Sequence, residues 1–212
     1  MQCIYVCAKL TKNVLGDEMG LGIFDLTKCS DLGYKDRIDI YKETGVGELS
    51  LYIDNDYMQE GEDYNLIIAY ARDNGLKINQ VHIDYKQSNL ICDETTDSFF
   101  EYISKKAHEC MMLNIPYMVL HPSKGENPPE ISQKQLDKLK MVVSKFPNVM
   151  FCFENVRSIK NLKKILALDV NNIKACYDLG HAHAYYDEFE LFDELKNKII
   201  CITITEKMNT AP

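Results

Sequence analysis

The chain has 212 residues, of which 46% are hydrophobic and 26% charged, and this predicts one globular domain over residues 1–212. Its net charge of −8 disfavours proteins that grip the phosphate backbone of nucleic acids, because such binding requires many cations. There is no apolar run of membrane-spanning length and no basic, signal-like start. The eight cysteines contain no CxxC pair and resemble buried thiols in a reducing compartment. The sequence therefore predicts a cytoplasmic protein without a membrane partner.

Short β-rich runs alternate with polar helical segments along the chain. The runs are apolar nearly throughout, as strands buried on both faces are, and they occupy residues 20–26, 47–53, 79–85, 116–121, 148–154, 173–178 and 198–205. Amphipathic helices are predicted over residues 34–44, 62–74, 97–113, 132–145, 158–167 and 188–196. Gly45, Gly75 and Asn114 follow three of these helices as stop signals. This alternation predicts βαβ units and a parallel sheet, either open or closed into a barrel.

Side chains of the metal-ligand type gather at the ends of the predicted strands. They are His82, His121, Glu154, Asp178 and His181, with Glu48, Asp84, His183 and Glu206 as further polar residues assigned to the same ends. A single residue of this kind is more often a loop or helix-cap group. Several at one end of consecutive strands favour a divalent-metal site, because a buried charge needs a partner and parallel strands end together. Nitrogen and carboxylate ligands suit zinc or manganese.

Two other enzyme classes are disfavoured. The chain has neither a Gly-rich phosphate loop nor a GxGxxG sequence after a strand. It also lacks the nucleophile elbow of the Ser-His-Asp hydrolases. His108 falls in the middle of a predicted helix and is expected to be a surface or packing residue.

Four motifs in order resemble the xylose-isomerase-like TIM barrel superfamily, which includes sugar isomerases, sugar epimerases and endonuclease IV. They read VHIDY at 81–85, VLHP at 119–122, FEN at 153–155 and DLGHA at 178–182. The resemblance runs from about residue 20 onward and implies a (β/α) TIM-type barrel. It also implies that the metal ligands are His82, His121, Glu154, Asp178 and His181, and that Glu154 can move a proton beside a substrate carbonyl.

The sequence departs from the family near its C-terminal end. Residues 203–206 read TITE where family members usually carry a metal-binding histidine, so Thr203 replaces that histidine and Glu206 is at best a substitute catalytic carboxylate. The eighth strand, with its usual glutamate, is not found before Pro212. A full barrel of this type typically needs about 250 residues. The resemblance therefore predicts an incomplete barrel of about seven parallel strands.

Three functions are compatible with these residues. The first is a metal-dependent isomerase or epimerase of a small sugar-like substrate, with its chemistry impaired by the departures. The second is an endonuclease IV-like phosphodiesterase, which the acidic composition disfavours. The third is a catalytically inactive barrel that binds a ligand.

One strand-like segment, at residues 3–10, precedes the family-like region. Seven parallel strands would leave an apolar seam between the first and the last, which invites aggregation. The connection to the next strand is too short for a helical crossover, so the segment is predicted to pair antiparallel at this seam. A homodimer that covers the seam, or disorder of the residues before Met19, are the alternatives.

Overall fold

The computed structural model describes residues 5–9, 21–25 and 31–204. Eight strands form a closed ring in sequence order. They are β1 (Tyr5–Lys9), β2 (Leu21–Asp25), β3 (Glu48–Tyr52), β4 (Lys77–His82), β5 (Tyr117–Leu120), β6 (Met150–Glu154), β7 (Ile173–Asp178) and β8 (Ile199–Ile204). Strands β2 to β8 are parallel, and the barrel is TIM-like but incomplete, because β1 does not belong to a parallel βα unit. The predicted fold class is confirmed.

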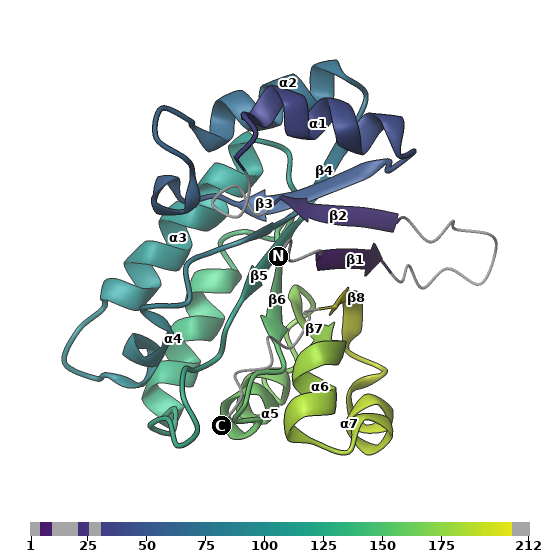
Figure 1. Ribbon diagram of the computed structural model, residues 1–212. Coiled ribbons are helices and arrows are strands. Elements are labelled where there is room, and N and C mark those ends of the chain that lie inside the picture. Colours follow the sequence, from purple (N-terminus) through teal and green to yellow (C-terminus); the bar gives the residue numbers. More distant parts are fainter. Residues whose placement is uncertain (1–4, 10–20, 26–30, 205–212) are drawn as a thin grey trace.

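Helices cover the outer side of the sheet, and β1 lies on the side opposite α3 and α4 (Figure 1). They are α1 (Tyr34–Glu43), α2 (Tyr64–Asp73), α3 (Ser98–Met112), α4 (Gln133–Val143), α5 (Lys160–Leu166), α6 (Leu179–Tyr185) and α7 (Glu188–Leu195), with short 3₁₀ turns η2 (Asn55–Tyr57) and η3 (Ser88–Cys92). All but α6 were predicted. Gly45, Gly75 and Asn114 have positive φ angles of 79°, 85° and 52°, which is the left-handed conformation of a helix stop.

The barrel has two hydrophobic regions. A large core lies between the sheet and the helices, and a small layer fills the barrel interior beneath the candidate site. The small layer consists of Val119, Cys152, Cys176 and Cys201, one from each of the strands β5 to β8. The three cysteines of this layer are buried and have free thiols, as the sequence predicted. The interior at this level is therefore packed with side chains, as in other small barrels.

Strand β1 closes the ring at the predicted seam. It pairs antiparallel with β2, where Tyr5 lies opposite Phe24, and antiparallel with β8, where Val6 lies opposite Ile204. The sequence-based prediction of an antiparallel closing strand is confirmed. Because β1 runs against its neighbours, it places no βα loop at the end of the barrel where the other strands finish.

We expect the β1 amides to be protected in a hydrogen-exchange experiment, because the strand has ladder partners on both sides. Protection that is equal at low and high protein concentration would show that closure occurs within one chain. Fast exchange of these amides at every concentration would contradict the closed ring.

A buried ion network joins β2, α1 and the segment before α2. Arg37 donates from Nε to Asp25 (2.9 Å) and from Nη2 to both Asp25 (3.2 Å) and Glu62 (3.0 Å). Its Nη1 donates to Glu62 and to the carbonyl of Leu32. The side chain of Arg37 is 3% exposed, that of Asp25 0% and that of Glu62 8%. This network fixes the first helix against the end of the first parallel strand.

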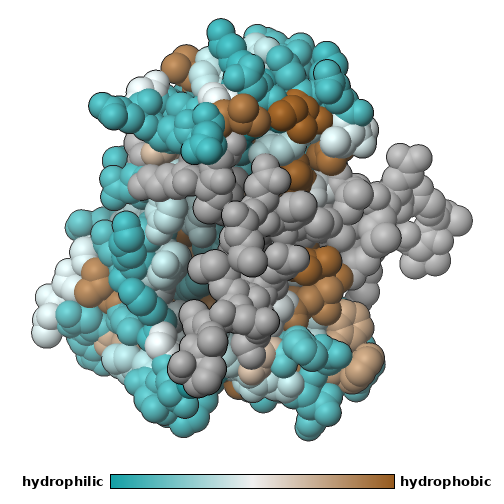
Figure 2. All heavy atoms as spheres, in the orientation of Figure 1, coloured by the Kyte–Doolittle hydropathy of each residue, from teal (hydrophilic) through white to brown (hydrophobic). Residues whose placement is uncertain are grey.

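On the face shown in Figure 2, hydrophilic residues dominate the described surface over the helices, and hydrophobic residues form separate patches. Among the described residues, no helix is both long enough and apolar enough to cross a membrane.

Candidate metal centre

The five predicted ligand residues lie around one pocket at the end of the barrel where the parallel strands finish. His82, Glu154 and Asp178 are the last residues of β4, β6 and β7. His121 follows β5 directly, and His181 stands in the first turn of α6. All five line the same pocket of about 400 Å³. Alternation along the strands explains why the strand-end residues meet here, because each continues the face that fills the barrel interior.

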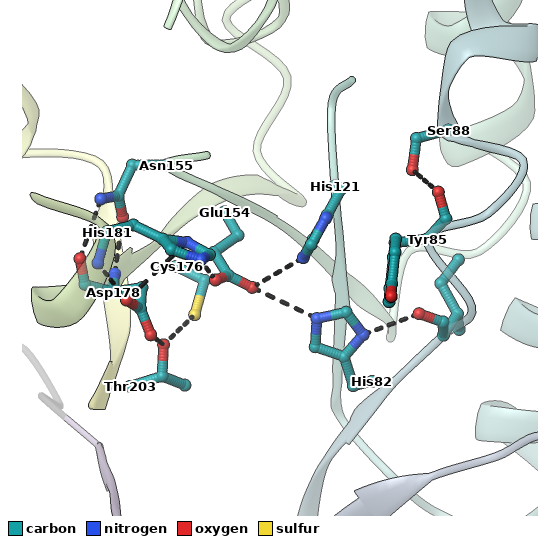
Figure 3. A network of polar contacts seen from close by, with 11 residues as sticks. His82, Tyr85, Ser88, His121, Glu154, Asn155, Cys176, Asp178, His181 and Thr203 are labelled. Carbon is teal, nitrogen blue, oxygen red and sulfur yellow. Dashed lines mark hydrogen bonds and ion pairs between the residues drawn. The ribbon is translucent and has the colours of Figure 1, made fainter. Parts of the chain in front are cut away.

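Glu154 lies at the centre of the cluster (Figure 3). Its Oε2 is 3.2 Å from Nε2 of His82 and 3.3 Å from Nε2 of His121, and its Oε1 is 3.0 Å from Nδ1 of His181. Asp178 Oδ1 lies 3.7 Å from the same His181 nitrogen. Ligands that share one ion through bonds of about 2.0–2.2 Å lie roughly 3 to 3.5 Å apart, which is the spacing of the Glu154 contacts.

The ligand atoms divide into two groups that share Glu154. One group is His82, His121 and Glu154, and the other is Glu154, Asp178 and His181. Within each group the ligand atoms lie within 4.8 Å of one another. The described residues therefore offer a candidate metal-binding cluster of imidazoles and carboxylates.

The contacts of the histidines with Glu154 are compatible with a cation between them. Nδ1 of His82 lies 2.7 Å from the carbonyl oxygen of Ile83, so this nitrogen must carry the proton and donate it. In the neutral ring, Nε2 then presents a lone pair to the Glu154 carboxylate, which is repulsive unless a cation separates the two atoms. Nδ1 of His181 is buried and makes no hydrogen bond among the described residues, despite its 3.0 Å distance from Glu154. These donor atoms fit a divalent metal ion.

The charge states of Glu154 and His121 also suit ligation, whereas that of His181 opposes it. Burial alone would raise the pKa of Glu154, but the neighbouring His121, His181 and His82 hold it well below its usual range. Burial lowers the pKa of His121 and favours its neutral form. Burial opposes the charge on His181 as well, but the carboxylates of Glu154 and Asp178 outweigh this and raise its pKa. A metal ion binds an ionised carboxylate and a neutral imidazole, so His181 has to release its proton when it binds one.

Asp178 is held in place by neighbours from three directions. The side chain of Asn155 makes two hydrogen bonds to the backbone of Asp178. Its Nδ2 donates to the Asp178 carbonyl (2.9 Å), and its Oδ1 accepts from the Asp178 amide (2.6 Å). Asp178 Oδ1 accepts from the amide of His181 (2.6 Å) and so caps α6. Its Oδ2 accepts from the hydroxyl of Thr203 (2.9 Å). Thr203, which stands where the sequence resemblance implies a histidine, therefore orients a candidate ligand.

We predict that Thr203→Val weakens metal binding about 10- to 100-fold, because the substitution keeps the shape of the side chain but frees the Asp178 carboxylate to rotate. The measurement is a metal titration by calorimetry. Thr203→Ser is the matched control and should bind nearly as well as the wild type, because it keeps the hydroxyl. Equal affinities for all three proteins would contradict this role of Thr203.

Aromatic side chains form much of the pocket wall. Phe24, Tyr52, Tyr85 and Tyr185 line the pocket together with the ligand residues. The ring of Tyr85 stacks on that of His121 with a centroid distance of 5.2 Å and an angle of 23°. Flat apolar faces beside a few polar groups are typical of small-molecule sites, and a pocket of about 400 Å³ has the size of such a site.

The remaining polar residues assigned to strand ends have different positions. Glu206, the second predicted catalytic carboxylate, lies outside the described residues. Glu48 was assigned wrongly, because it begins β3 and therefore lies at the opposite end of the barrel. Asp84 accepts a hydrogen bond from the hydroxyl of Tyr57 (2.7 Å). His183 is exposed on α6, 3.1 Å from Glu188.

Neither a family model nor a curated protein matches the sequence. Solved structures do resemble it. D-psicose 3-epimerase from Clostridium cellulolyticum H10, solved with D-tagatose, matches with a TM-score of 0.58 at 16% identity over 76% of this chain and 64% of that chain. A xylose isomerase domain protein from Planctomyces limnophilus gives 0.65 at 12% identity over 85% and 71%. Endonuclease IV from Thermus thermophilus gives 0.54 at 14% identity over 84% and 71%.

The chain thus spans slightly less than two thirds of the length of the epimerase. At these identities the likeness concerns the arrangement of strands and helices, and it joins proteins of different chemistry. The ring of strands in sequence order, seven of them parallel, agrees with it. The chain therefore has the fold of the xylose isomerase-like TIM barrels.

Proposed function

We propose that the protein is a metal-dependent isomerase or epimerase of a small sugar-like substrate. The observation that supports this most strongly is the convergence of three imidazoles and two carboxylates around Glu154 in a pocket of about 400 Å³. His82, His121, Glu154, Asp178 and His181 would hold one divalent ion, zinc or manganese. When bound, such an ion polarises a substrate carbonyl and lowers the pKa of the neighbouring C–H group.

In the proposed reaction, Glu154 also serves as the base. Its carboxylate takes the proton from the carbon beside the substrate carbonyl, and the C–H electron pair moves to form the enediolate. Return of the proton from Glu154 to the former carbonyl carbon, with passage of the neighbouring hydroxyl proton to the former carbonyl oxygen, completes an isomerisation. Because its pKa is held well below the usual range, Glu154 is a weak base, and we expect that ligation is its main role.

The number of proton-transfer groups separates the two reaction types. An isomerisation needs one base, because the proton leaves and returns on the same face of the substrate. An epimerisation needs a second group on the opposite face. Glu206 is the proposed second group, and it lies outside the described residues. The placement of Glu206 therefore decides between the two reactions.

The test combines metal content with solvent isotope exchange. The protein is dialysed against manganese or zinc, its metal is counted by mass spectrometry, and ketoses and aldoses are incubated with it in deuterated water. We expect one exchangeable ion per chain and deuterium at the carbon beside the carbonyl. A protein that binds no metal would contradict the proposal and support the inactive ligand-binding barrel.

A metal-dependent phosphodiesterase is the second candidate. It is favoured by the two ligand groups that share Glu154, since a shared carboxylate can bridge two ions. The likeness to endonuclease IV extends to the fold alone. The net charge of −8 opposes tight binding of duplex DNA, because few cations are available to replace counterions. Two or three ions per chain, together with sub-micromolar binding of abasic duplex at physiological salt, would favour this candidate over the isomerase.

A further inference from the structure

The loop after β5 carries a polar group that the metal cluster does not use. Ser123 is fully buried and lines the pocket, yet its hydroxyl has no hydrogen-bond partner among the described residues. A buried hydroxyl without a partner costs roughly 1–3 kcal/mol, so such groups usually serve a ligand or a water molecule. The hydroxyl can donate a hydrogen bond after rotation about a single side-chain bond.

Two cationic residues line the same pocket as this hydroxyl. Lys124 follows Ser123 in the same loop, and Arg157 comes from the loop after β6. The Lys124 ammonium lies 5.5 Å from the centre of the Tyr85 ring, which itself stacks on His121. The Arg157 guanidinium lies 5.6 Å from the centre of the Tyr185 ring, which is 6.0 Å from the His181 ring. Each cation is thus held by an aromatic ring that borders a candidate metal ligand.

The backbone around Lys124 is fixed. Its amide donates to Asn89 Oδ1 (2.8 Å), and its carbonyl accepts from Asn89 Nδ2 (3.0 Å). Gly125 follows with φ of 92°, a conformation that a side chain would strain. Because the main chain is anchored in this way, the contact with the Tyr85 ring can set the direction of the Lys124 side chain.

The charge of the two cations is available to a ligand. Arg157 forms an ion pair with Glu126 (2.8 Å), but both side chains are about half exposed or more, and such surface pairs contribute little. Glu154 and Asp178 together carry the charge that offsets a divalent ion. Lys124 and Arg157 are therefore not required to balance the metal cluster, and their charges can face a negatively charged ligand.

We propose that Ser123, Lys124 and Arg157 form an anion-binding subsite, so that the substrate of this pocket is a small molecule with a phosphate or carboxylate group. The subsite deepens the proposed function, because it would hold one end of the substrate while the other end reaches Glu154. Arg157 offers paired hydrogen-bond donors, Lys124 offers a compact positive charge, and Ser123 offers a neutral donor. Together these groups are suited to bind an oxyanion.

The experiment compares three ligands with one carbon skeleton, namely glycerophosphate, glycerate and glycerol, by calorimetric titration of the metal-free protein. At least one of the anions should bind tenfold or more tightly than glycerol, a difference of about 1.4 kcal/mol. The stronger of the two anions identifies phosphate or carboxylate as the preferred group. Equal binding of all three ligands would overturn the proposal.

The variant Lys124→Met/Arg157→Met keeps the apolar stems on Tyr85 and Tyr185 but removes the charges. It should lose about tenfold or more in anion affinity, whereas the pair Lys124→Arg/Arg157→Lys, which keeps both charges, should retain part of that affinity. Lys140→Met/Lys145→Met is the control for net charge, because both lysines are exposed and neither lines the described pocket. Anion binding that is unchanged in the charge-free variant would refute the subsite.

Metal content is measured on the same proteins. If the wild type binds no metal but discriminates anions as described, the proposed isomerase function fails and the subsite stands. If it binds metal but does not distinguish glycerophosphate or glycerate from glycerol, the subsite fails and the proposed function stands.

Discussion

Glu154→Gln should nearly abolish metal binding and leave the barrel folded. The amide has the same size as the carboxylate but lacks the negative charge that faces three imidazole nitrogens at 3.0–3.3 Å. We expect the affinity for manganese or zinc to fall by more than about 100-fold, beyond the effect of removing a residue that only orients a ligand. The measurement is the dissociation constant from a competition titration, together with the melting temperature of the metal-free protein.

Glu126→Gln is the matched control for this variant. Glu126 is exposed beside the pocket wall, and its removal changes the net charge by the same amount. It should bind metal as the wild type does. A large drop in melting temperature for metal-free Glu154→Gln, with metal affinity retained, would mean that Glu154 is a structural ion-pair partner of the histidines and not a ligand.

Arg37→Met should destabilise the protein by about 3–5 kcal/mol, because it leaves the buried carboxylates of Asp25 and Glu62 without their counter-charge. Methionine fills much of the space of the arginine stem, so the loss would come chiefly from the charge and from the hydrogen bonds to Asp25, Glu62 and Leu32. Urea unfolding of the metal-free protein gives the free energy directly.

Lys42→Met on the same helix is the control for Arg37→Met. Lys42 is exposed, and its contact with Asn74 is long at 3.4 Å, so the substitution should change stability by less than about 0.5 kcal/mol. A loss of under about 1 kcal/mol for Arg37→Met would show that the two carboxylates take up protons or water easily, and that the network contributes little.

The strands could be predicted because each signal was local. Strands buried on both faces are short apolar runs, and alternation within 117–121 and 150–154 indicated which side chains face the barrel interior. Candidate ligands stand at the ends of these runs, as His121 and Glu154 do. The antiparallel strand β1 followed from the length of its connection and from the need to close the seam.

Other features depend on contacts between distant residues and left no local signal. Helix α6 begins directly after β7 without a loop, and Asp178, which was interpreted as a ligand, is also the cap of this helix. Pairing of β8 with β7 brings Thr203 to Asp178, and pairing of β6 with β7 brings Asn155 to the same residue. The cations at Lys124 and Arg157 lie in loops whose course no periodicity predicts.

The pairing of β1 with β8 has a consequence for synthesis on the ribosome. Roughly 190 residues separate these strands, so at typical rates of about 5–20 residues per second β1 leaves the ribosome some ten seconds or more before its second partner exists. During that time β1 can pair only with β2, as a hairpin. The barrel therefore cannot close until β8 has been made, and its last step joins β1 to β8, a contact of high sequence separation that forms slowly.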